Sequence, residues 1–232
     1  MSSLLAVAIV LLSAAVHATL QLGLGALLLL YHASLGKHVR AKTKNLVGSF
    51  ISGMGMFILL GLAAATFMIG ALADDGLPLP CLVGLVVILI MLAIVIWFFY
   101  YRRGRSTELW LPKVVARYIN NRAKVTESNT EAFSLGLLAS FGELPFTLVL
   151  TVIAANSILD VPREVQPLLA VAYTMLAILP LVIMRISIRR GNTVVDIQRW
   201  RVKNKVFLRI ISGVLFLTLG LFLLAFQVMG VV

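Results

Sequence analysis

The stretch that decides the fold is PCLVGLVVILIMLAIVIWFFYY, residues 80–101, which contains no charged side chain over its whole length. An α-helix needs about 20 mainly apolar residues to cross the hydrocarbon core of a bilayer. Five further stretches are apolar enough and long enough, at residues 4–30, 46–72, 132–155, 168–188 and 206–228. The sequence therefore predicts an all-α, polytopic membrane protein with six transmembrane helices.

The composition agrees with a surface that faces lipid. Hydrophobic residues make up 61% of the 232 residues and charged residues only 12%, whereas a soluble domain is about 45–50% apolar and about 25% charged. The net charge of +11 would suggest a nucleic-acid partner in a soluble protein. In a membrane protein, lysines and arginines gather in the cytoplasmic loops. We therefore expect no nucleic-acid partner, and instead a lipid bilayer with anionic lipids at its cytoplasmic face.

The positions of the basic residues predict the orientation of the helices. All but one of the 20 lysines and arginines lie at residues 31–45, 102–131 and 185–209. The exception, Arg163, lies with Asp160 and Glu164 between the fourth and fifth spans, and the second connection carries Asp74 and Asp75. Basic connections thus alternate with acidic or mixed ones, as the positive-inside rule requires of six consecutive spans. This predicts an N-out, C-out multi-pass protein, and the expected location is the plasma membrane of a prokaryote.

The chain divides into a first three-helix half at residues 1–101, a basic cytoplasmic loop at residues 102–131 and a second three-helix half at residues 132–232. In the loop, Trp110, Val114, Val115, Tyr118 and Ile119 recur near helical spacing, which favours an amphipathic helix on the inner leaflet. The pattern Ser128-x-x-Glu131 predicts a capping box that opens the fourth span.

The two halves resemble each other at an offset of 126 residues. LLSAAVHAT at 11–19 aligns with LLASFGELP at 137–145, and the same offset carries the third span onto the sixth. Because each half has three spans, the halves would be oppositely oriented, and inverted repeats with interrupted helices are typical of secondary transporters. Gly23 and Gly25 could interrupt the first span, and Pro145 the fourth, since proline removes a backbone donor and clashes with the preceding turn.

The alignment places His17 opposite Glu143. Each lies about a dozen residues into its span, which at about 1.5 Å per residue is near the bilayer midplane. An ionisable group there costs about 2.5–3.5 kcal/mol and should face the bundle interior or an aqueous cavity. Glu143 could bind and release a proton during transport, or His17 and Glu143 could hold a cation or metal ion, with Thr19, Gln21 or Thr147 nearby and Pro145 in the same turn as Thr147. The structural alternative is a protonated Glu143 that bridges helices through a hydrogen bond to His17.

Small residues predict where helices pack closely. Gly53 and Gly61 would serve the second span, and Gly213 and Gly220 the sixth. The lone cysteine, Cys81, allows no intramolecular disulfide.

The 3 + 3 arrangement, the Gly/Pro-interrupted first and fourth spans and the sixth-span pattern IISGVL at 210–215, followed by LGL at 219–221, resemble the lysine-exporter superfamily. That superfamily includes amino-acid and metal-ion exporters and the membrane domain of thiol-disulfide transporters. The thiol-transporting members carry a cysteine in each of the first and fourth helices, where this chain has His17 and Glu143. The resemblance therefore implies transport without dithiol electron transfer, and it does not name the substrate.

The predicted function is a secondary transporter or exporter that moves a small solute or cation by alternating access, with proton coupling through Glu143. The alternative is a non-transporting membrane protein that serves assembly or interaction through its basic inner surface. No enzyme activity and no cofactor are expected, because the spans hold no His-rich motif and no paired acids. Association into a homo-oligomer is left open.

Overall fold

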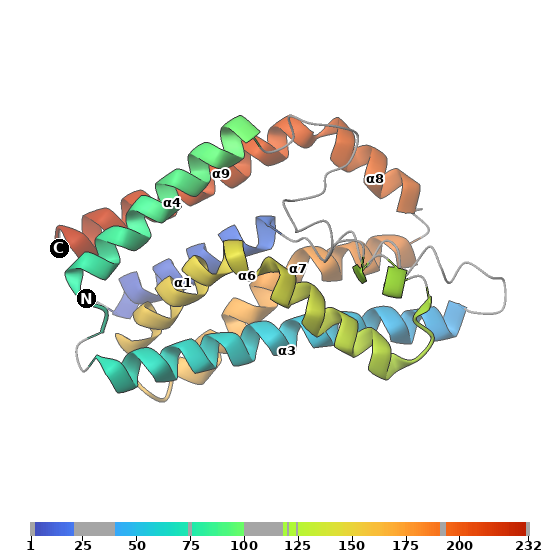
Figure 1. Ribbon diagram of the computed structural model, residues 1–232, viewed down its shortest axis with the longest axis horizontal. Helices are drawn as coiled ribbons and strands as arrows, with labels where there is room; N and C mark the ends of the chain where they lie inside the picture. Colours follow the sequence, from blue (N-terminus) through green and yellow to red (C-terminus); the bar gives the residue numbers. More distant parts are fainter. Residues whose placement is uncertain are drawn as a thin grey trace.

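The structure is a computed structural model, and it describes residues 3–20, 40–73, 76–99, 118–119, 121–123, 125–190 and 194–230. Within these residues the chain forms long helices, which run back and forth along one axis (Figure 1). They are α1 (Ser3–Thr19), α3 (Arg40–Leu72), α4 (Leu79–Phe99), α6 (Asn129–Leu159), α7 (Gln166–Arg189), α8 (Val194–Lys203), α9 (Lys205–Leu223) and the π-helix η1 (Leu224–Val228).

Five helices of the described chain are long and apolar enough to cross a membrane, in α3, α4, α6, α7 and the α9–η1 unit. The sixth, α1, is apolar but shorter, with 17 residues. The prediction of long apolar helices is thus confirmed for five of the six expected spans. The second part of the predicted first span, including Gln21, Gly23 and Gly25, lies outside the described residues.

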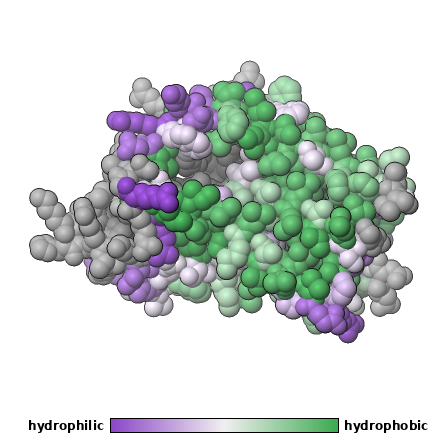
Figure 2. All heavy atoms as spheres, turned by 180° about the vertical axis from the view of Figure 1, so that it is seen from behind, coloured by the Kyte–Doolittle hydropathy of each residue, from purple (hydrophilic) through white to green (hydrophobic). Residues whose placement is uncertain are grey.

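The outer surface of the bundle is apolar. Large hydrophobic side chains point away from it, including Phe67, which is 77% exposed, and Leu168, which is 70% exposed. Figure 2 shows a broad hydrophobic area over one face, with most of the hydrophilic side chains at one end and a smaller group at the other. The structure is therefore compatible with a multi-pass membrane protein.

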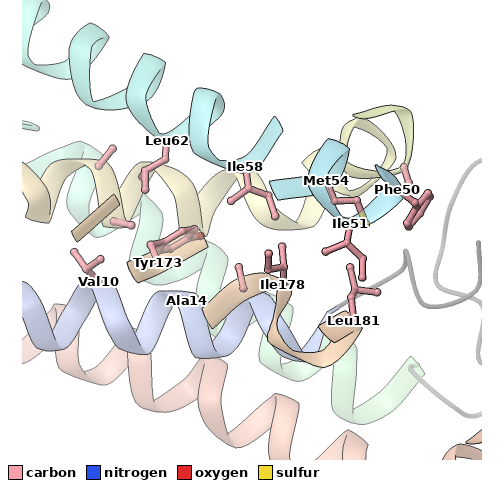
Figure 3. Packing of buried hydrophobic residues seen from close by; sticks show 14 of the residues in the cluster. Val10, Ala14, Phe50, Ile51, Met54, Ile58, Leu62, Tyr173, Ile178 and Leu181 are labelled. Carbon is pink, nitrogen blue, oxygen red and sulfur yellow. The ribbon is translucent and has the colours of Figure 1, made fainter. Parts of the chain in front are cut away.

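Two clusters of buried side chains hold the bundle together. The larger cluster joins α1, α3, α6 and α7, and the smaller one joins α1, α4, α6 and α9. Figure 3 shows the first cluster, in which Val10 and Ala14 of α1, Ile58 and Leu62 of α3 and the ring of Tyr173 of α7 meet. α1 and α6 take part in both clusters, so they form the centre of the molecule.

Glycine sets the closest helix approaches. A Cβ atom added at Gly53 of α3 would overlap the carbonyl oxygen of Phe133 in α6, and one at Gly136 would overlap that of Phe50 in α3. The prediction of close packing is confirmed at Gly53. It is wrong at Gly61, where an added Cβ would meet no atom within 4 Å, because that side of α3 faces outward.

The sixth span behaves as predicted. Gly213 of α9 lies directly beneath the indole ring of Trp97 in α4, where an added Cβ would overlap the ring, and Gly220 lies against Leu89 of the same helix. Both glycines therefore let α4 and α9 pack side by side, in the hairpin-like pair seen in Figure 1.

α6 opens with the predicted capping box. The Ser128 side chain accepts a hydrogen bond from the Glu131 backbone N–H at 3.1 Å, and the Glu131 carboxylate accepts from the backbone N–H of Ser128. The predicted interruption at Pro145 is wrong, since α6 continues through the proline to Leu159. The helix instead changes direction near its middle (Figure 1). The Thr147 hydroxyl donates to the Glu143 carbonyl at 3.1 Å, which reinforces the turn where proline removes a backbone donor.

α8 is a short helix that the sequence did not predict, and it carries the exposed ion pair Asp196–Arg199 at 3.9 Å. The expected amphipathic helix of the third connection lies largely outside the described residues, as do Trp110, Val114 and Val115. Its described end, Tyr118 and Ile119, is helical, with Tyr118 exposed and Ile119 buried.

Candidate functional site

Polar side chains occur inside the bundle on the two central helices. Ser13 and His17 are buried on α1, while Ser140, Glu143 and Thr147 are buried on α6. In α6 these three residues are three and four positions apart, so they share one face of the helix. The two ionisable groups that the sequence singled out, His17 and Glu143, are only 3% and 1% exposed. Neither faces the lipid-exposed surface.

His17 forms its hydrogen bond with a residue of α7. Its Nδ1 atom lies 3.0 Å from the hydroxyl oxygen of Tyr173, and the two rings meet edge to face with centroids 5.8 Å apart. Tyr173 is completely buried among Val10, Ala14 and the side chains of α3 (Figure 3). The sequence did not single out Tyr173. The phenol of Tyr173 within a mainly apolar span could have indicated this residue, because a buried tyrosine hydroxyl usually needs a hydrogen-bond partner.

The side chain of Thr151 on α6 lies near the Tyr173 phenol. The Thr151 hydroxyl lies 3.0 Å from the Thr147 carbonyl, to which it donates, and Thr147 in turn donates to the Glu143 carbonyl. Glu143, Thr147 and Thr151 follow each other at four-residue intervals, so the face that carries Glu143 continues to the His17–Tyr173 pair. Eight residues of helix separate Glu143 from Thr151, or about 12 Å along the axis.

A serine accompanies each of the two ionisable residues. Ser13 lies one turn before His17, and Ser140 one turn before Glu143. Both hydroxyls are buried and have no hydrogen-bond partner within the described part of the chain. Buried polar groups in proteins are nearly always hydrogen-bonded, so each such hydroxyl calls for an explanation, such as a water or an ion.

The other residues predicted for the site fall into three groups. Thr147 is buried on the face described above, whereas the ring of Pro145 is exposed on the opposite side of α6. Thr19 is half-buried at the end of α1, and its hydroxyl donates to the Val16 carbonyl at 2.8 Å. Gln21 lies outside the described residues. Over the described ranges, no three His, Cys, Asp or Glu side chains come close enough together to hold a metal ion.

A separate cavity of about 280 Å³ lies where the end of the third connection meets the start of α6. Its polar lining includes Arg122 and Thr130, and its apolar lining includes Tyr118, Leu135 and Leu138. It opens at the end of the bundle where α3 and α6 begin, far from Thr151 along α6. This cavity is therefore distinct from the His17–Tyr173 site.

No protein-family model, curated protein or solved structure matches this chain.

Proposed function

We propose that this chain is a secondary transporter that moves a small solute or cation across the plasma membrane by alternating access, with proton coupling. The observation that carries the proposal is the pair of buried ionisable residues on adjacent central helices, His17 on α1 and Glu143 on α6. An ionisable side chain within a membrane-spanning bundle is expensive to place and usually belongs to a substrate or proton pathway.

The unpartnered serine hydroxyls support a site for a polar ligand. Ser13 and Ser140 lie within one turn of His17 and Glu143, and within the described residues neither hydroxyl has a partner. Carboxylate and hydroxyl oxygens are suitable ligands for a hard cation. The same oxygens could accept hydrogen bonds from an ammonium group. This set therefore fits a small cation or a cationic solute better than an anion.

The packing of the helices supports an inverted repeat of the kind the lysine-exporter resemblance implies. If the halves are related by a two-fold axis that exchanges α1 with α6, α3 with α7 and α4 with α9, every contact should have an image. α1 packs on α7 as α6 packs on α3, and α1 touches α9 as α6 touches α4. The self-paired contacts, α1–α6, α3–α7 and α4–α9, all occur as well. Of the other contacts, those of α6 with α7 and of α8 with α9 join helices linked by a short connection, and η1 continues α9 along α4.

The positions of the chain ends and of the helix connections fit an N-out, C-out orientation. α1 begins and η1 ends at the same end of the bundle as the connection from α6 to α7 (Figure 1). The basic residues of α8 and the start of α9 lie at the other end, which would face anionic lipids of the cytoplasmic leaflet.

Flux measurements in proteoliposomes test the proposal. The wild type should transport at least one member of a panel of monovalent cations, divalent cations and cationic amino acids, and Glu143→Gln should abolish coupled flux while the protein still folds. The matched control is Glu164→Gln, which removes an exposed acid from the α6–α7 connection. Wild-type flux equal to that of empty liposomes across the panel, or full transport by Glu143→Gln, would contradict the proposal. The first result would favour the non-transporting alternative.

A further inference from the structure

The cavity at the start of α6 has one cation and one anion among the described residues that line it. Arg122 comes from the helical segment before α6, and Glu131 from the first turn of α6 itself. Within the described part of the chain, these two side chains form no ion pair with each other. A cavity that presents both charges separately is complementary to a ligand that also carries both.

Arg122 is held in place by its neighbours and can bind a phosphate. Ile119 and Ala123, on either side of it in the same helical segment, are buried in the larger hydrophobic cluster. They fix the segment on the bundle, while Arg122 itself is exposed and lines the cavity. A guanidinium can bind phosphate oxygens through two parallel hydrogen bonds. The hydroxyls of Thr130 and Ser134, one turn apart on α6, line the same cavity and can donate to the same phosphate.

The Glu131 carboxylate has one oxygen that can receive a ligand. Its hydrogen bonds from the backbone N–H groups of Glu127 and Ser128 both go to Oε2, at 3.1 and 3.5 Å. Oε1 of the same carboxylate can therefore accept from a ligand. A primary ammonium group has three N–H donors for such an oxygen, whereas a quaternary ammonium has none. The cavity thus favours a phosphate with a primary ammonium close by.

The exposed face of α6 changes from polar to apolar with distance from the cavity. Leu138 lines the cavity one turn after Ser134. Phe141, which is 60% exposed, lies two turns after Ser134, and its ring meets that of Phe57 in α3 edge to face with centroids 6.3 Å apart. From Thr130 to Phe141 the helix rises about 16 Å. A polar group at the membrane surface followed by an apolar stretch matches the build of a phospholipid.

This face of α6 is reached from the bilayer and not from the buried centre of the bundle. Ser134 and Glu143 are nine residues apart, which at about 100° per residue places them on opposite sides of the helix. Tyr118, an exposed phenol at the edge of the cavity, is of the type that is enriched at membrane–water interfaces. The volume of about 280 Å³ is below the 300–1,000 Å³ usual for drug-sized ligands, so the cavity fits a headgroup but not the acyl chains.

We propose that this cavity binds the headgroup of phosphatidylethanolamine from the membrane leaflet next to the start of α6. The phosphate binds Arg122, the ammonium binds Glu131, and the acyl chains lie outside the cavity over Leu138 and Phe141. In the N-out, C-out orientation this leaflet is the cytoplasmic one. The proposal requires a membrane location but no transport activity, so it goes beyond the proposed function and can stand without it.

Native mass spectrometry of the purified, delipidated protein tests the site with short-chain phosphatidylethanolamine, phosphatidylcholine and phosphatidylglycerol. The wild type should bind phosphatidylethanolamine about tenfold more tightly than the other two. Arg122→Gln should weaken the binding of all three by about tenfold, because each loses a charge-assisted hydrogen bond to its phosphate. Glu131→Gln should remove the preference for phosphatidylethanolamine and leave phosphatidylcholine binding unchanged. Glutamine still completes a capping box at this position, so α6 keeps its start.

Two exposed residues provide matched controls. Arg163→Gln removes an arginine from the α6–α7 connection, and Glu127→Gln removes an acid one turn before Glu131. Neither residue lines the cavity, so neither variant should change lipid affinity.

Glycerophosphoethanolamine, which has the headgroup without acyl chains, separates a lipid from a soluble phosphate ester. It should bind at least about tenfold more weakly than the lipid, since it buries no apolar chain. Equal affinity would assign the cavity to a soluble ligand and overturn the lipid site. Full lipid affinity in Arg122→Gln, an unchanged preference in Glu131→Gln, or a wild-type preference for phosphatidylglycerol would overturn the headgroup assignment. A failure of the flux measurements would contradict the proposed function alone.

Discussion

Gly53 of α3 and Gly136 of α6 face each other at a helix crossing so close that a methyl group on either would overlap the backbone of the other helix. The obstacle in both cases is a carbonyl oxygen, which cannot rotate away as a side chain can. Gly53→Ala should therefore force α3 and α6 apart and lower the free energy of unfolding by about 1–3 kcal/mol, the usual cost of overpacking. A lower melting temperature in detergent micelles would show it.

Gly61→Ala is the matched control for that variant, because it makes the same change in the same helix where no atom lies within 4 Å. It should leave stability unchanged or raise it slightly, since alanine is the better helix former. Equal melting temperatures for the two variants would mean that the α3–α6 crossing is looser than described.

The sequence predicted both Gly53 and Gly61 as packing residues and could not tell them apart. Small residues indicate that a helix can be approached closely, but the direction of approach depends on which face meets α6. Hydropathy, in contrast, located the spans well, because span length and apolarity are properties of a local stretch and do not depend on which face packs. The capping box of Ser128 and Glu131 was predictable on the same ground.

Tyr173 shows why part of the site could not be predicted. The alignment of the halves pointed from α1 to α6, and so from His17 to Glu143. The hydrogen bond of His17 instead goes to α7. Only the packing of α1 between α6 and α7 brings this phenol to the imidazole, and no spacing within a single span encodes that contact. Whether Glu143 and His17 act on one ligand stays a prediction.

Asn156 should stabilise the connection between α3 and α4. Its side-chain oxygen accepts a hydrogen bond from the Leu77 backbone N–H at 2.8 Å, next to Gly76, which has a φ of 82°. Asn156→Ala should leave that N–H without its acceptor and lower the free energy of unfolding by about 1–3 kcal/mol. Thermal unfolding in detergent measures the change.

Gly76→Ala should be destabilising for two reasons. The left-handed backbone costs an L-residue about 1–2 kcal/mol, and the new Cβ would lie 3.0 Å from the Asn156 side-chain oxygen. Gly230→Ala controls for the first reason alone, since Gly230 also has a positive φ, of 62°, but no neighbour within 4 Å. If both variants unfold at the same temperature, the contact with Asn156 adds nothing.

Asp160, the C-cap of α6, should lower stability at neutral pH. Although the residue is exposed, partial desolvation raises the pKa of its carboxyl above the ordinary value, and the negative end of the helix dipole also disfavours a carboxylate there. A raised pKa in the folded state means that the native protein gains stability below the unfolded pKa, about 3.9, and loses it as pH rises through the folded value. Asp160→Asn should therefore melt at a higher temperature than wild type at pH 7, with the difference vanishing below about pH 3.9. Glu164→Gln removes a charge from the same connection without changing the cap, and an equal gain from it would attribute the effect to net charge instead.

Cysteine labelling should show that the α6–α7 connection and α8 lie on opposite sides of the membrane. The background is Cys81→Ser, since Cys81 is exposed and is the only cysteine. With the N-out, C-out orientation, Glu164→Cys should react with a membrane-impermeant maleimide in intact cells, and Arg199→Cys only after the membrane is permeabilised. Both positions are exposed, so poor access within the protein would not explain a failure to react. Labelling of both in intact cells would place acidic and basic connections on one side, which six alternating spans do not allow. The reverse pattern would keep the fold but invert it.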